Sequence, residues 1–145
     1  MLPRSGSQFF LTAVGLLVLG GVVLGCTTTG ISGPDPGDEG IATVDSLVAP
    51  QRIAPTDTLT VRLIGQVGPN GCYSLAGIDA SRDADGVRLV PRVRHERGGM
   101  CTMAIVPLDA THRVDPPFEP GSFTIEIPQA NQPTVTATVT VAADG

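Results

Sequence analysis

The chain has no lysine and no tryptophan, and it has only one tyrosine and two histidines. All nine basic residues are therefore arginine, and 14 acidic residues bring the formal net charge to −5. Nucleic-acid binding is disfavoured, because phosphate contacts need concentrated positive charge. The scarcity of aromatic rings argues against a carbohydrate site built on stacking. Two histidines also leave little material for a catalytic base or a zinc site.

The N-terminal segment has the pattern of an export signal. One basic residue, Arg4, precedes an apolar run from Phe9 to Leu24 that only Thr12 and three glycines interrupt. As a helix this run would span roughly 25 Å. Because that length is short of the roughly 30 Å hydrocarbon core, a permanent membrane-spanning helix is the weaker interpretation.

A cysteine follows the apolar run directly. The Val-Leu-Gly tripeptide at 23–25 and Cys26 resemble the lipobox of bacterial lipoproteins, although leucine is commoner than valine at the first position. The resemblance implies removal of residues 1–25 as a signal peptide, diacylglycerol on the Cys26 thiol and acylation of the new amino terminus, which is a durable anchor. The alternative is an ordinary thiol at the end of a spanning helix. In that family a residue other than aspartate after the cysteine, here Thr27, favours the outer membrane.

The remaining chain divides into a linker and one domain. Residues 26–40 hold the cysteine and a stretch rich in glycine, threonine, proline and acids. This stretch has almost no apolar surface to bury, so we predict a flexible linker. Residues 41–145 are long enough for one hydrophobic core and too short for two domains.

From Ile41 onward apolar residues alternate with polar ones, and proline or glycine interrupts the chain every few residues. This pattern predicts strands rather than helices. We expect strands near 43–48, 58–63, 73–80, 87–95, 101–106, 111–114, 122–127 and 134–141. Asp85-Gly86 predicts a hairpin turn. The fold class is therefore all-β: an immunoglobulin-like two-sheet sandwich of about seven or eight strands after a signal helix and linker. A small closed barrel is the alternative.

Several motifs resemble bacterial lipoproteins with immunoglobulin-like domains. The segments Asn-Gly-Cys-Tyr at 70–73 and Cys-Thr-Met-Ala-Ile-Val-Pro at 101–107 form the paired pattern, and the resemblance extends over about residues 42–128. Pro-Gly-Ser-Phe at 120–123 resembles the start of a late strand in such modules, with Phe123 in the core. The resemblance implies a structural framework and brings no chemistry with it.

Cys72 and Cys101 are the only other cysteines. Export would place them in an oxidising compartment, so we expect a disulfide between them. In the chain-entropy model, closing a loop of about 30 residues stabilises the fold by roughly 3.5 kcal/mol. Free thiols are an alternative. A metal site is a weaker one, because only His95 and His112 could complete it.

Four arginines gather along one predicted strand and just beyond it: Arg88, Arg92, Arg94 and Arg97. Such a face could bind a carboxylate-rich partner or lipid headgroups, because guanidinium groups bind carboxylate and phosphate bidentately. One alternative is a solvated sheet face whose arginines pair with nearby acids. Another is an edge strand charged against aggregation.

Other candidates for chemistry are weak. Asp79, Asp83 and Asp85 could converge on a calcium ion, but their spacing matches no EF-hand loop. His95 and His112 belong to no serine-nucleophile or metal motif. We therefore expect no metal, no cofactor and no catalysis.

Together these features predict an exported lipoprotein of the bacterial cell envelope, held at the membrane by lipid on Cys26. The expected role is non-catalytic: an envelope binding or accessory module that contacts a protein or glycan through a sheet face or loops. The arginine face is the best candidate for that contact. A purely structural component without a specific ligand is the first alternative, and a small enzyme is the weakest.

Overall fold

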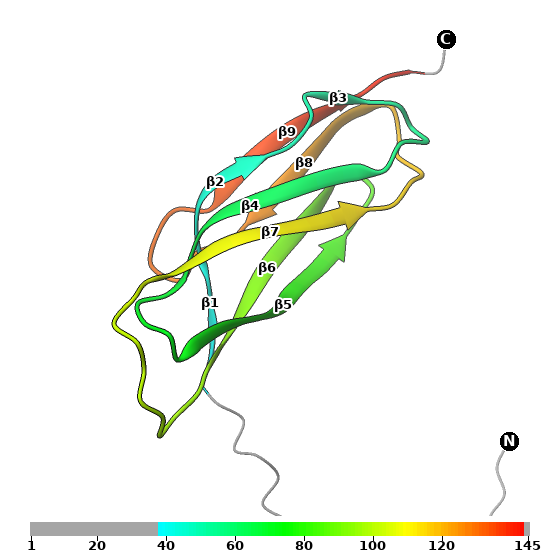
Figure 1. Cartoon of the computed structure of the whole chain (residues 1–145). Coiled ribbons are helices and arrows are strands. Elements are labelled where there is room, and N and C mark those ends of the chain that lie inside the picture. The colour runs from blue at the N-terminus through cyan, green and yellow to red at the C-terminus, as the bar shows by residue number, and fades with distance from the viewer. Residues whose placement is uncertain (1–37, 144–145) are drawn as a thin grey trace, which may run out of the picture. The chain divides into compact units, whose positions relative to one another are not determined.

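The computed structural model describes residues 38–143, which form two β-sheets packed face to face (Figure 1). The larger sheet contains β1 (Asp38–Ile41), β3 (Arg52–Ile53), β5 (Tyr73–Arg82), β6 (Gly86–His95), β8 (Gly121–Ile127) and β9 (Val135–Val141). The smaller sheet contains β2 (Thr43–Val48), β4 (Leu59–Gly68) and β7 (Val106–Val114). The all-β two-sheet sandwich is confirmed, with nine strands in the described part of the chain instead of seven or eight.

The core lies between the two sheets and follows the alternation of the sequence. Leu59, Val61 and Leu63 on β4 are fully buried, and Leu89 on β6 and Ile125 on β8 are fully buried opposite them. Burial of large aliphatic side chains is the main stabilising term in such a domain. The positions of strands that show this alternation could therefore be predicted closely from the sequence.

Phe123 also lies in the core, as predicted, with only 2% of its surface exposed. Its ring meets that of Phe118 edge to face, with the centroids 5.1 Å apart. Arg82, at the end of β5, covers this pair: its guanidinium carbon lies 4.5 Å from the Phe118 ring centroid. The same guanidinium donates hydrogen bonds to the backbone carbonyls of Asp115 and Pro117. It thereby joins the β5–β6 hairpin to the loop before β8.

β6 lies in the interior of the larger sheet. β5 pairs with it along one side, while β1 and β8 share the other side, β1 antiparallel and β8 parallel. The interpretation of the arginine strand as a charged edge strand is therefore wrong. In the described part of the chain, β5 is the edge strand next to it, because β5 pairs with β6 alone.

The predicted strand at 101–106 is wrong. Residues 101–105 belong to a loop, and a single strand, β7, runs through Val106–Val114. The reason is the length of β4. It pairs with β7 from Leu59, opposite Val114, as far as Gly68, opposite Val106. Beyond Gly68 the chain turns away, so residues 101–105 have no neighbouring strand with which to pair.

Two short strands were not predicted. β1 begins at Asp38, three residues before the expected start of the domain, and β3 has only two residues. Neither segment alternates in hydrophobicity. Each is a strand because a longer neighbour pairs with it: β6 with β1 and β9 with β3.

Candidate functional site

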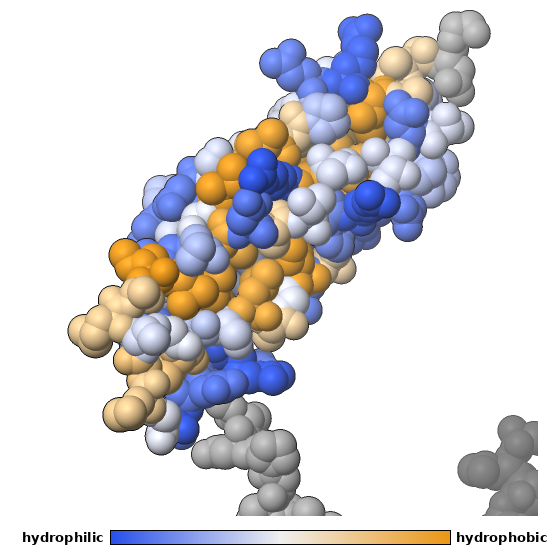
Figure 2. Space-filling model, in the orientation of Figure 1, coloured by the Kyte–Doolittle hydropathy of each residue, from blue (hydrophilic) through white to orange (hydrophobic). Residues whose placement is uncertain are grey.

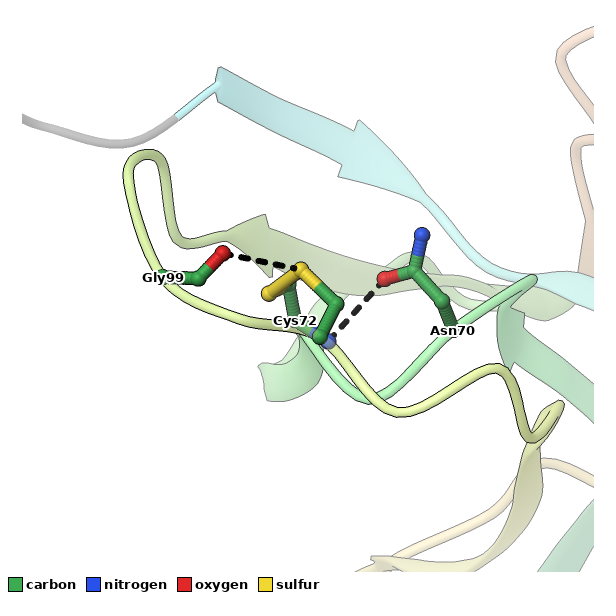
Figure 3. Close-up of a disulfide and its surroundings, with 4 residues drawn as sticks. Asn70, Cys72 and Gly99 are labelled. Carbon is green, nitrogen blue, oxygen red and sulfur yellow. Dashed lines mark hydrogen bonds between the residues drawn. A yellow bond between two sulfur atoms is a disulfide. The ribbon is translucent and has the colours of Figure 1, made fainter.

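A disulfide fastens one end of the sandwich (Figure 3). It joins Cys72 and Cys101, as expected, with their Cα atoms 5.2 Å apart. The amide of Cys72 donates to Oδ1 of Asn70 at 3.0 Å, and the carbonyl oxygen of Gly99 lies 3.7 Å from Sγ of Cys101. Cys101 lies in a loop, so the expectation that it begins a strand is wrong.

Backbone hydrogen bonds close the same end of the domain. The amide of Gly71 donates to the carbonyl oxygen of Thr102 at 3.0 Å. The amide of Glu96 donates to the carbonyl oxygen of Cys72 at 2.9 Å. The loop after β6 is thus held against the segment before β5 at three points, one covalent and two hydrogen-bonded.

The histidines do not form a catalytic arrangement in the described residues. His95 stacks on Tyr73, its partner across the β5–β6 pair, with ring centroids 4.4 Å apart. His112 lies on β7, in the other sheet. Within residues 38–143 no three His, Cys, Asp or Glu side chains lie close enough to share a metal ion.

The three aspartates of the calcium hypothesis do not converge. The carboxylate of Asp79 accepts a hydrogen bond from Arg92. Asp83 instead accepts one from the amide of Asp85 at 3.1 Å, inside the hairpin turn. These contacts stabilise a sheet face and a turn, which is a common role of exposed acids.

Arg88, Arg92 and Arg94 lie on the outer face of β6 and are exposed to solvent, as their alternation predicted. Nε of Arg92 donates to Oδ2 of Asp79 at 2.7 Å. Beyond the strand, Arg97 forms a two-pronged ion pair with Asp38 on β1. The hydrogen bond and charge of Arg97 lower the pKa of the Asp38 carboxyl below its ordinary value.

Acidic side chains from neighbouring strands balance this arginine face. Arg94 lies opposite Glu39 on β1, and Arg88 lies beside Glu126 on β8. A shallow hollow of about 390 Å³ opens beside Arg88, and Asp83, Asp85 and Glu126 contribute three carboxylates to its lining. Such a surface does not attract anions strongly. Of the four arginines, Arg88 and Arg94 form no ion pair with an acidic side chain among residues 38–143.

An exposed apolar loop follows β6, and the sequence analysis missed it. Met100, Met103 and Ile105 have exposed fractions of 103%, 94% and 64%. Figure 2 shows apolar side chains gathered at this end of the domain. A signal was present in the sequence: the eleven residues from Gly98 to Leu108 include no charged side chain. Because residues 101–106 alternate, the sequence predicts a strand there instead of an exposed loop.

The fold defines the class of protein: an all-β sandwich of two sheets with one disulfide. Residues 61–141 match the family model of the ORF11 beta-sandwich domain. The match covers more than half of the 145 residues, so the chain belongs to this family. Comparison with curated proteins and with solved structures gave no match.

Cys26 and the apolar run at 9–24 lie outside the described residues, and so do the predicted signal helix and most of the linker. Residues 38–143 contain no helix of the length and hydropathy that crossing a membrane requires.

Proposed function

We propose that the protein is a non-catalytic lipoprotein of the bacterial cell envelope, which holds a β-sandwich close to a membrane through a lipid on Cys26. The observation that carries this proposal is the Cys72–Cys101 disulfide, because such bonds persist in oxidising compartments outside the cytosol. The lipobox pattern at 23–26 supplies the anchor. A two-membrane bacterium would carry the protein on its outer membrane.

The linker sets how far the domain can lie from the membrane. Cys26 and Asp38 are 12 residues apart. A chain of that length spans at most about 40 Å when fully extended. As a flexible, glycine-rich coil its root-mean-square length is about 20 Å. The end of the sandwich that carries Asp38 can therefore lie no farther than about 40 Å from the proposed lipid on Cys26.

Cys26→Ser tests the anchor. We expect the variant to keep residues 1–25 and to carry no acyl chains, because the serine hydroxyl cannot form the thioether that directs processing. The measurement is the intact mass of protein extracted from membranes, before and after reduction and thiol alkylation. The wild-type protein should begin at Cys26, carry acyl chains, and gain alkylation at Cys72 and Cys101 only after reduction.

Thr27→Ser is the matched control, since it changes the neighbouring residue and leaves the lipobox intact. It should give the wild-type mass, less one methylene. The proposal fails if the wild-type protein begins at Met1 and its other two cysteines react without reduction.

An envelope protein with exposed carboxylates is the partner that the arginine face would accept. Arg92 and Arg97 already bind Asp79 and Asp38, so the contact falls to Arg88 and Arg94. These two side chains lie on one sheet face and can each offer a guanidinium fork to a carboxylate. The balanced charge of the face limits this contact to a modest, salt-sensitive affinity.

Reversing both charges, Arg88→Glu with Arg94→Glu, should weaken such a complex at least tenfold. The readout is the size of the complex in gently solubilised membranes, followed against salt concentration. Arg113→Glu is the control, because Arg113 is also exposed but lies on β7 in the other sheet. A wild-type protein that migrates as a single chain at low salt would exclude the partner and favour a purely structural role.

A further inference from the structure

The loop between β6 and β7 presents apolar side chains directly to solvent. Met100 and Met103 are essentially fully exposed, and Ile105 is about two thirds exposed. Thr102 is the one polar side chain between them, and no charge occurs from Gly98 to Leu108. Single exposed apolar residues are common on protein surfaces, but a charge-free cluster of large ones marks a contact site.

The structure holds this loop away from the core. The disulfide and the Gly71–Thr102 hydrogen bond fix its middle to the segment before β5. Gly98, with a φ of 84°, makes the turn by which the chain leaves β6. With the middle of the loop fastened in this way, Met100 and Met103 on either side of it remain exposed instead of packing against the sandwich.

The loop lies at the end of the domain where the described chain begins. Asp38, the first residue of β1, is the register partner of His95, the last residue of β6. The ion pair between Asp38 and Arg97 then joins the start of β1 to the loop itself. Figure 1 shows the start of β1 and the loop at the same end of the sandwich. The opposite end is about 33 Å away, the length of a ten-residue strand.

We propose that Met100, Met103 and Ile105 insert into the interfacial region of the bilayer to which the chain is attached. The inference rests on the proposed membrane attachment, and it holds whether the attachment is lipid on Cys26 or the apolar run at 9–24. A linker of 12 residues keeps the loop within reach of the lipid surface, so insertion is an intramolecular step at high effective concentration. The segment from Gly98 to Ile105 carries no charge, so its insertion desolvates no charged side chain.

The composition of the loop favours lipid over protein as its partner. Protein interfaces are enriched in aromatic residues, Met and Arg, but their hot spots are mainly Trp, Tyr and Arg and are surrounded by a polar rim. The segment from Gly98 to Ile105 has no aromatic side chain, no arginine and only one hydroxyl. A lipid surface requires none of these, because it offers no fixed hydrogen-bonding groups to match.

Methionine oxidation tests the proposal in the full, processed protein. The chain has three methionines, and removal of residues 1–25 would leave Met100 and Met103. Glu119→Met adds a reference methionine in the exposed loop before β8, at the opposite end of the domain. The protein is incorporated into vesicles of phosphatidylethanolamine and phosphatidylglycerol and treated with hydrogen peroxide, and each sulfoxide is quantified by mass spectrometry.

We expect Met100 and Met103 to oxidise at least fivefold more slowly than the reference methionine. Equal rates at all three sites, in protein that sediments with the vesicles, would overturn the insertion and leave the anchor intact. Protection in native membranes but not in pure lipid vesicles would also overturn it and would indicate a protein partner. Protein that does not sediment with vesicles would contradict the attachment as well, and so the proposed function.

Discussion

Replacing Cys72 and Cys101 together by alanine is expected to lower the midpoint of thermal unfolding by about 10 °C or more. The bond closes a loop with a sequence separation of 29. In the chain-entropy model a loop of that size is worth roughly 3.5 kcal/mol. For a domain of about 100 residues, each kcal/mol corresponds to roughly 4–8 °C. Multiplying these two figures gives a larger shift than the one expected here. We expect the smaller shift because residual structure in the unfolded chain reduces the entropic effect of the bond.

The measurement is a pair of melting curves by circular dichroism, with and without a reducing agent. Reduction of the wild-type protein should lower its midpoint to that of the double variant, and the double variant should not respond to reduction. A double variant that melts with the oxidised wild type would show that the bond contributes nothing to stability.

Phe123→Ala is expected to lower the free energy of unfolding by about 3–5 kcal/mol, a large share of what a small domain has. Phe123 is 2% exposed and packs on Phe118, which is also buried. Truncation at Cβ removes the ring from between the two sheets and leaves a cavity that the surrounding strands can fill only partly. It also leaves Phe118 and the guanidinium of Arg82 without their inner neighbour.

Urea unfolding monitored by circular dichroism measures this loss as a shift of the midpoint at unchanged slope. Phe123→Leu keeps most of the volume and should cost far less than the alanine variant. Ser122→Ala changes the exposed neighbour on the same strand and should stay within about 0.5 kcal/mol of wild type. If the alanine and leucine variants unfold alike, packing around the ring is not the source of stability.

The sequence predicted most of the sandwich because alternation is a direct record of burial on one sheet face. β9 and the first half of β4 illustrate this, because buried or half-buried residues alternate there with exposed ones. β1 could not be found in this way, since its residues owe their conformation to pairing with β6 rather than to their own pattern. Segment 101–105 misled the prediction for the opposite reason, because it alternates yet has no strand beside it.

The same limit applies to the candidate sites. The pairing of Cys72 with Cys101 could be predicted because they are the only cysteines besides Cys26 and because export was expected. The acidic neighbours of the arginine face could not be predicted, because they come from three other strands. They are Asp79 on β5, Glu126 on β8 and Glu39 on β1. Only the register between distant segments determines which carboxylate meets which guanidinium.

β1 has a mechanical consequence under the proposed anchor. A pull on the residues before β1 would reach the described part of the chain at Asp38. Four residue pairs join β1 to β6, so a pull along the strand would load them together in shear rather than opening them one after another from an end. The ion pair between Arg97 and Asp38 lies at the point where the force arrives. A load on the proposed anchor would therefore reach the pairing of β1 with β6 before it reached the hydrophobic core.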